Sequence, residues 1–285
     1  MDASEVTRRR LLQLAGLGVG AYAASGCTAS HPPPSPLPNP PVGPPSVAMR
    51  GGSFVSRFRP AATTHWSIAT PVLPGRSGTD FPLALFLHGL GGDNEGIFDV
   101  LKAHEVLRRH LFIGGAPFAI ASVDGGDTWW HPRADGSDSQ SMLADEFVPF
   151  LGSQGYDLGR IGLFGLSMGG FGVLLLASQA RLPGIRAVAA MSPAVWDRYD
   201  ERIEGAFDSP SDFAAHNVFS LRPRLAAIPK RVDCGTEDEL FPWVKKYASG
   251  LPGVVEGGFR TGGHDADYWR AILPDVVSFL GRHLR

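Results

Sequence analysis

The chain has 285 residues, of which 44% are hydrophobic and 19% are charged, and its formal net charge is −2. This composition is ordinary for a soluble globular protein, and the length is enough for one large α/β domain. A nearly balanced charge offers no basic footprint for nucleic acid, so we expect no nucleic-acid partner.

Residues 1–27 are expected to form a targeting segment. Residues 7–12 (TRRRLL) resemble a twin-arginine signal, and the uncharged run 11–24 is too short for a comfortable membrane span. Residues 24–27 (ASGC) resemble a bacterial lipobox, in which Cys27 is lipidated, although Ala24 stands where leucine is usual. We expect an exported protein, held on the cell envelope by this lipid. The alternatives are a secreted protein released by signal peptidase and an uncleaved anchor.

A proline-rich linker is expected over residues 28–48. Nine of the fifteen residues 31–45 are proline, a composition that favours extended polyproline II and cannot build a core. Behind a lipid anchor it would act as a semi-rigid stalk. The remaining chain, 49–285, is the expected catalytic domain. Its one cysteine, Cys234, would be a small buried residue without a disulfide partner if Cys27 is lipidated.

Apolar runs and helical stretches alternate through this domain, after two expected edge strands at 54–58 and 65–70. Buried strands are expected at 83–87, 118–123, 161–164, 187–191, 230–234 and 254–260. Helices are expected at 94–109, 141–151, 168–180, 239–249 and 266–280. The alternation predicts an α/β fold with a mostly parallel, doubly wound sheet. Residues 192–229 separate two strands and predict a small cap insertion over the site.

The most informative motif is Gly-x-Ser-x-Gly at 165–169, which lies between a buried strand and an apolar helix. This is the setting of a nucleophile elbow, in which a sharp turn raises the serine above the sheet. Glycines at 165 and 169 would avoid a collision across the turn. The motif therefore predicts Ser167 as a nucleophile, and the N–H of Met168 as one donor to an oxyanion.

A serine nucleophile needs a base, and the base needs an orienting acid. In hydrolases with this elbow the acid and then the histidine follow the serine along the chain. His264 follows the last expected strand on a glycine loop, which suits the base. Residues 233–239 offer four carboxylates after a strand, of which Glu237 and Asp238 would lie on the loop itself. A second oxyanion donor is expected from the loop 88–92 (HGLGG).

Aromatic residues suggest where a substrate passes. Trp129 and Trp130 follow an expected strand, and Trp196 lies in the expected cap, so we expect these three to bind substrate; the alternative is loop packing. No group of His, Cys and Asp has the spacing of a metal site, and the glycines form no dinucleotide or phosphate-binding fingerprint. We therefore expect no metal and no cofactor.

Five segments together resemble the α/β-hydrolase family that holds esterase D, feruloyl esterase modules and mycolyltransferases. They are 87–92 (LHGLGG), 165–170 (GLSMGG), 191–196 (MSPAVW), 234–238 (CGTED) and 263–269 (GHDADYW). The resemblance spans about 80–281 and implies an α/β-hydrolase fold. Its Gly-Thr-x-Asp pattern implies Asp238 as the triad acid, and its first oxyanion loop implies the N–H of Leu90 as a donor.

The sequence thus predicts an exported serine carboxylesterase with the triad Ser167, Asp238 and His264. Its substrate would be a small-molecule, lipid or sugar ester, and its only membrane contact the lipid anchor. One alternative is a mycolyltransferase-like acyltransferase. That branch usually has an aspartate where His88 stands and a glutamate as acid, and these departures favour hydrolysis. The other alternative is a non-catalytic surface protein that kept the fold.

Overall fold

The computed structural model describes residues 43–60, 62–73 and 79–285. The predicted signal segment, Cys27 and the linker as far as residue 42 lie outside these ranges. Strand β1 begins at Ser46, inside the range expected for the linker. Among the described residues, no helix is both long and apolar enough to cross a membrane.

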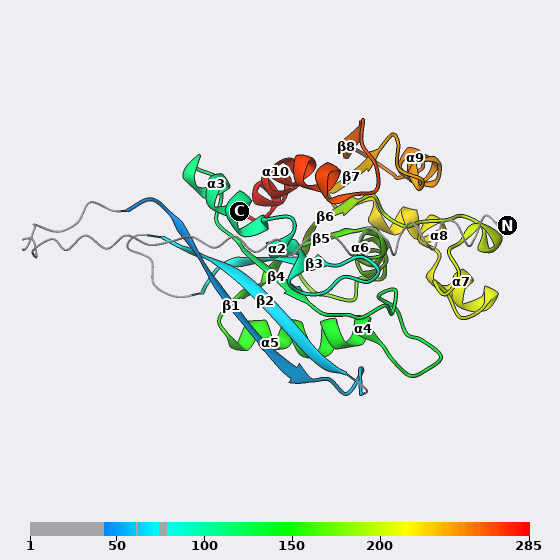
Figure 1. The fold of residues 1–285 in the computed structure, drawn as a ribbon, viewed down its shortest axis with the longest axis horizontal. Helices are drawn as coiled ribbons and strands as arrows, with labels where there is room; N and C mark the ends of the chain where they lie inside the picture. The colour runs from blue at the N-terminus through cyan, green and yellow to red at the C-terminus, as the bar shows by residue number, and fades with distance from the viewer. Residues whose placement is uncertain (1–42, 61, 74–78) are drawn as a thin grey trace, which may run out of the picture.

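Eight strands of the described chain form one sheet in the order β1-β2-β4-β3-β5-β6-β7-β8 (Figure 1). Strands β1, β2 and β4 pair antiparallel, and every pairing from β4 to β8 is parallel. The strands are β1 Ser46–Val55, β2 Thr63–Val72, β3 Pro82–Leu87, β4 Ala119–Val123, β5 Asp157–Leu166, β6 Ile185–Met191, β7 Lys230–Gly235 and β8 Val255–Arg260. The predicted mostly parallel sheet is confirmed, although its first strand starts well before the expected residue 54.

Helices cover both faces of this sheet (Figure 1). One face carries α2 Gly96–Asp99, α3 Ala103–Phe112 and α10 Ala266–His283. The other carries α4 Ser139–Ser141, the π-helical turn Met142–Phe147, α5 Val148–Ser153 and α6 Met168–Gln179. Helix α9 Phe241–Ser249 follows β7. Two separate apolar layers result, and this is the doubly wound arrangement that parallel strands require.

The expected single helix at 94–109 is two helices in the structure. Helix α2 ends at Asp99, and α3 begins at Ala103. Between them Lys102 has a left-handed backbone, with φ 56° and ψ 37°. The break lies at a lysine, and no nearby glycine or proline signals it, so the sequence pattern could not locate it.

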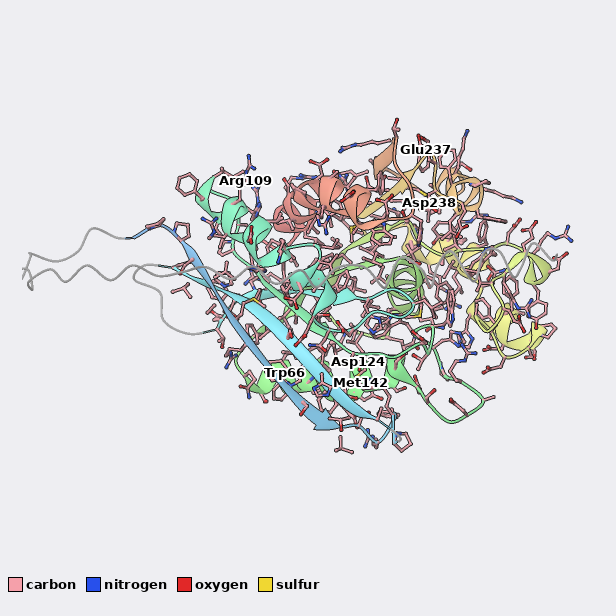
Figure 2. The ribbon with its side chains drawn as sticks, in the orientation of Figure 1. Trp66, Arg109, Asp124, Met142, Glu237 and Asp238 are labelled. Carbon is pink, nitrogen blue, oxygen red and sulfur yellow. The ribbon has the colours of Figure 1, made fainter. Side chains whose placement is uncertain are left out.

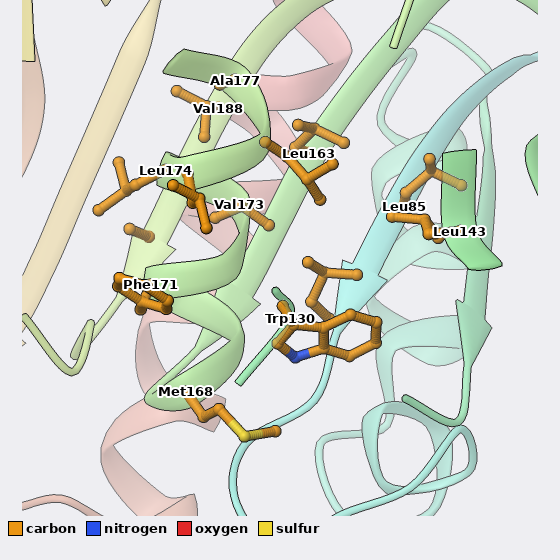
Figure 3. Packing of buried hydrophobic residues seen from close by; sticks show 14 of the residues in the cluster. Leu85, Trp130, Leu143, Leu163, Met168, Phe171, Val173, Leu174, Ala177 and Val188 are labelled. Atoms are coloured by element: carbon orange, nitrogen blue, oxygen red, sulfur yellow. The ribbon is translucent and has the colours of Figure 1, made fainter. Parts of the chain in front are cut away.

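The central strands β3 and β5 are apolar on both sides because each face is covered. Leu163 lies beside Val173 of α6, and Leu85 lies beside Leu143 of the π-helical turn (Figure 3). The Trp130 ring belongs to the same cluster. The alternate residues of the same strands, such as Phe86, pack toward α3 and α10. Because side chains on both faces of these strands are buried in apolar layers, polar functional side chains can lie only at the strand ends and in the loops that follow them.

The segment between β6 and β7 forms the predicted insertion. It holds two short 3-10 turns, Tyr199–Glu201 and Arg222–Leu225, and the helices α7 Pro210–His216 and α8 Val218–Leu221. Ser209 begins α7 by accepting a hydrogen bond from the N–H of Asp212, and proline occupies the next position. Phe207 from this segment packs against Phe171 in the first turns of α6, with ring centroids 5.6 Å apart.

Candidate active site

Ser167 occupies the sharp turn between β5 and α6. Its backbone has φ 53° and ψ −119°, a conformation that side chains rarely adopt and that marks a strained position. Both flanking positions must be glycine because there is no room for a Cβ atom. A Cβ on Gly169 would overlap the carbonyl oxygen of Leu87, and a Cβ on Gly165 would overlap the carbonyl oxygen of Gly169. The turn leaves Ser167 only 7% exposed at the carboxyl end of the sheet.

Three side chains from distant parts of the chain form one hydrogen-bonded series. The Nε2 atom of His264 lies 2.9 Å from the Oγ of Ser167, and its Nδ1 lies 2.8 Å from Oδ2 of Asp238. A carboxylate can only accept, so Nδ1–H donates to Asp238 and Nε2 is left to accept the serine proton. The structure therefore brings together all three residues of the predicted triad, in the geometry of a nucleophile, a base and an orienting acid.

Asp238 lies on the loop between β7 and α9, beside Glu237 (Figure 2). Its side chain is fully buried, and Oδ1 accepts the N–H of Leu240 at 2.8 Å. Burial alone would raise the pKa of Asp238, but the hydrogen bond and charge of His264 hold this pKa below its ordinary value. Glu237 is exposed. Geometry thus selects Asp238 between the two loop carboxylates.

His264 is held by neighbours to which the sequence motifs assigned no role. Its ring meets the ring of Trp269 edge to face, with centroids 5.0 Å apart. The indole N–H of Trp269 donates to the Oγ of Ser192 at 3.2 Å. Ser192 and Trp269 both belong to segments that carry the family resemblance. The sequence therefore marked these residues, but it did not indicate that they position His264.

The loop after β3 lies against the serine, as predicted for the oxyanion donors. A Cβ on Gly89 would stand 3.4 Å from the Cβ of Ser167. Met168 is the first residue of α6, so its N–H has no acceptor within the helix. The N–H of Gly91 donates to Oδ1 of Asp127 at 2.7 Å, which ties the loop to the next one. The donor roles of Leu90 and Met168 stay predictions.

His88 connects this loop to the loop after β4 through two hydrogen bonds, a role that the sequence did not indicate. It is buried, and its Nε2 accepts the N–H of Gly125 at 2.9 Å. Its own carbonyl accepts the indole N–H of Trp130 at 3.2 Å. Gly125 leaves room for the Trp130 ring, which a Cβ there would meet at 2.5 Å.

The contact of Trp130 with substrate stays a prediction, and the structure places its ring in the core. Its side chain is 0% exposed and packs among the residues of the sheet and α6 (Figure 3). Trp129 and Trp130 both have positive φ, at 58° and 55°, which is uncommon for large side chains. Trp129 and Trp196 are 3% exposed and pack on each other with centroids 5.7 Å apart. Their contact with substrate stays a prediction.

One further polar cluster was not expected. His131, Asp212 and His216 lie far apart in sequence, yet each offers a ligand atom within 4.8 Å of the others. The sequence spacing of these residues does not indicate a metal site, because the fold brings them together only in space. Cys234 is buried and free, as expected for a small core residue, and burial raises the pKa of its thiol.

The fold is similar to that of several solved esterases and serine hydrolases. A ferulic acid esterase matches with a TM-score of 0.72 and 19% identity, over 84% of this chain and 99% of that one. FphF, a fluorophosphonate-binding serine hydrolase of Staphylococcus aureus with substrate bound, matches with a TM-score of 0.67 and 17% identity, over 83% and 99%. An S-formylglutathione hydrolase from Agrobacterium tumefaciens matches with a TM-score of 0.68 and 15% identity, over 84% and 96%.

No protein-family model and no curated protein sequence matches the chain. The structural likenesses confirm the α/β-hydrolase fold that the five motifs predicted. Because the identities are below 20%, these likenesses establish the fold alone. The activity of this chain must be argued from its own residues.

Proposed function

We propose that the protein is a serine carboxylic ester hydrolase. The observation that carries the proposal is the continuous series from Ser167 through His264 to Asp238, with both hydrogen bonds below 3.0 Å. A hydroxyl, an unprotonated imidazole nitrogen and a buried carboxylate in this order are what activation of a serine requires. The fold that it shares with several esterases and serine hydrolases supports the same conclusion.

In the first half of the reaction the Oγ of Ser167 attacks the ester carbonyl carbon while its proton passes to Nε2 of His264. The imidazolium that forms is stabilised by the charge of Asp238, whose Oδ2 faces Nδ1. His264 then gives its proton to the leaving alcohol as the carbon–oxygen bond of the ester breaks. An acyl group remains on Ser167.

In the second half, water attacks the acyl carbonyl and transfers a proton to the same Nε2. Collapse of this intermediate breaks the bond to Oγ, releases the acid and returns the proton to Ser167. Both steps place negative charge on the carbonyl oxygen. The N–H groups of Leu90 and Met168 are proposed to stabilise it, and each such donor contributes about 3–4 kcal/mol in well-studied hydrolases.

The proposed substrate is a carboxylic ester of a small molecule, a lipid or a sugar. We further propose that the protein acts outside the cytoplasm, on the envelope or secreted. This localisation rests on the twin-arginine-like segment 7–12 and the lipobox-like residues 24–27.

The test is a hydrolysis profile on nitrophenyl esters from acetate to palmitate, with the Ser167→Ala variant alongside. We expect the variant to lose a factor of about 10⁴ or more in kcat. Ser178→Ala is the matched control, because Ser178 lies on the same helix and its hydroxyl only donates to the Leu175 carbonyl. A Ser167→Ala rate within tenfold of the wild type would remove Ser167 from the mechanism.

A further inference from the structure

A buried histidine and one face of a helix meet beside the candidate active site. His131 lies on the loop that follows β4, one residue after Trp130. Asp212 and His216 lie four residues apart on α7, so both project from the same side of that helix. The cluster therefore joins the loop to the insertion between β6 and β7.

The three side chains converge on one carboxylate oxygen. Oδ1 of Asp212 lies 2.8 Å from Nδ1 of His216 and 3.7 Å from Nδ1 of His131. A tetrahedral zinc ion with bonds of about 2.0–2.1 Å separates its ligand atoms by about 3.3 Å, which falls between these two distances. The two imidazole rings stack at 24° with centroids 4.6 Å apart. Because a nitrogen lone pair lies in the plane of its ring, one of the two rings must rotate when both bind the same ion.

The hydrogen bonds around His131 leave a place for a cation. Its Nε2 lies 3.1 Å from the carbonyl oxygen of Ala206, to which Nε2–H donates. Nδ1 then presents a lone pair to the carbonyl oxygen of Pro132 at 3.0 Å and to the Asp212 carboxylate. In the other neutral tautomer the lone pair would face Ala206 instead. Either neutral form sets a nitrogen lone pair against oxygen in a fully buried position, and either a second proton or a bound metal ion removes that conflict.

The surrounding contacts orient these residues as the outer shell of a metal site does. The Ala206 carbonyl fixes the tautomer of His131, as carbonyl groups do for metal-binding histidines. The N–H of Asp208 donates to Oδ2 of Asp212 at 2.8 Å, which leaves Oδ1 directed toward both rings. Two nitrogens and one carboxylate form a ligand set that suits zinc better than calcium or magnesium.

We propose that His131, Asp212 and His216 bind one zinc ion, with water as the fourth ligand. The ion would fasten α7 to the loop that carries Trp129 and Trp130, and it takes no part in ester hydrolysis. The site is structural and independent of the function proposed above.

The test titrates zinc chloride into the full chain, made without a polyhistidine tag and first dialysed against a chelator. Calorimetry is expected to show one ion per chain with a dissociation constant of about 1 µM or lower. Zinc at a hundredfold excess over that constant should raise the melting temperature by roughly 5 °C. Cobalt in place of zinc should give a visible absorption band from four-coordinate geometry.

Variants identify the ligands. Asp212→Asn and His216→Gln should each weaken zinc binding by at least about tenfold, and at the same zinc concentration the melting shift should fall to about half or less. His104→Gln is the matched control, because His104 also pairs with an acidic neighbour, Glu105, outside this cluster. His264→Gln must likewise retain binding. The proposal is overturned if the wild type shows no saturable binding up to about 100 µM zinc. It is equally overturned if His264→Gln abolishes binding, because the ion would then lie at the triad.

Discussion

At the scale of single residues, the proposed function depends on atoms that the chain brings together from three separate loops. Ser167 and His264 could be predicted because each lies in a short motif between a strand and a helix. The acid was open between Glu237 and Asp238 from the residues alone, because both lie on one loop. Only the fold decides which of them turns inward, and it buries Asp238 beside His264.

Other residues of the site could not be found in this way. The ring of Trp130 packs in the core at a residue with positive φ, a placement that no sequence pattern indicates for a tryptophan. His88 acts through a backbone N–H that belongs to Gly125. The His131 cluster depends on the packing of α7 against a loop, and that contact is long-range.

The Asp127 side chain gives a test of the oxyanion loop. Its Oδ1 accepts the Gly91 N–H, next to the proposed donor Leu90. Asp127→Ala should lower kcat by about tenfold, or about 1.4 kcal/mol in activation free energy, because the loop loses its tether. The measurement is steady-state kinetics on a short-chain nitrophenyl ester.

Asp93→Ala is the control for this loop. Asp93 also accepts backbone N–H groups, but they belong to Glu95 and Gly96 at the start of α2. We expect its kcat to stay near that of the wild type. Equal losses in the Asp93 and Asp127 variants would contradict a specific role for Asp127.

At the scale of elements, the order of strands and helices could be predicted from the sequence. The boundaries of several elements could not, as β1 and the break between α2 and α3 show. Most of the expected buried strands are apolar runs, and their positions agree with the structure to within a few residues. The expectation of a buried strand at 254–260 is wrong, because β8 Val255–Arg260 lies at the edge of the sheet and has no buried residue. Strand β1 begins earlier than predicted because Ser46–Val55 is largely exposed and lacks the apolar pattern of a buried strand. The break between α2 and α3 was missed because a lysine occupies it.

That lysine offers a stability test. Lys102 is exposed and left-handed, a conformation that costs an ordinary side chain about 1 kcal/mol and glycine little. Lys102→Gly should therefore raise the free energy of unfolding by about 0.5–1 kcal/mol in urea titration. Arg108→Gly, at an exposed position inside α3, should lower it by about 1 kcal/mol. A loss of stability in both variants would mean that Lys102 is not strained.

At the scale of the whole molecule, two apolar layers on one sheet hold the triad in place. The fold class could be predicted because alternating strands and helices admit few architectures. The placement of the insertion between β6 and β7 could not, because its helices are short and its anchor is a cluster of aromatic rings from three segments.

The packing of α3 on α10 predicts how stability depends on pH. The His110 ring lies against Phe118 and close to Gly281, and burial lowers its pKa despite the hydrogen bond to the Ala116 carbonyl. The unfolded chain therefore binds a proton that the folded chain does not. The free energy of unfolding should fall as the pH drops below the ordinary histidine value of 6.5.

The measurement is urea unfolding at a series of pH values between about 7.5 and 5. In the His110→Gln variant the amide can still donate to Ala116, and the slope should be smaller over this range. Identical slopes in the variant and the wild type would show that His110 does not contribute.

The central claim is that His264 activates Ser167 as a nucleophile, and covalent labelling tests it most directly. The intact protein is treated with a fluorophosphonate, and the adduct is located by peptide mass spectrometry. We expect one adduct, on Ser167, that is absent in Ser167→Ala and forms at least about a hundredfold more slowly in His264→Gln. Labelling elsewhere with Ser167 unmodified, or an unchanged rate without His264, would contradict the mechanism.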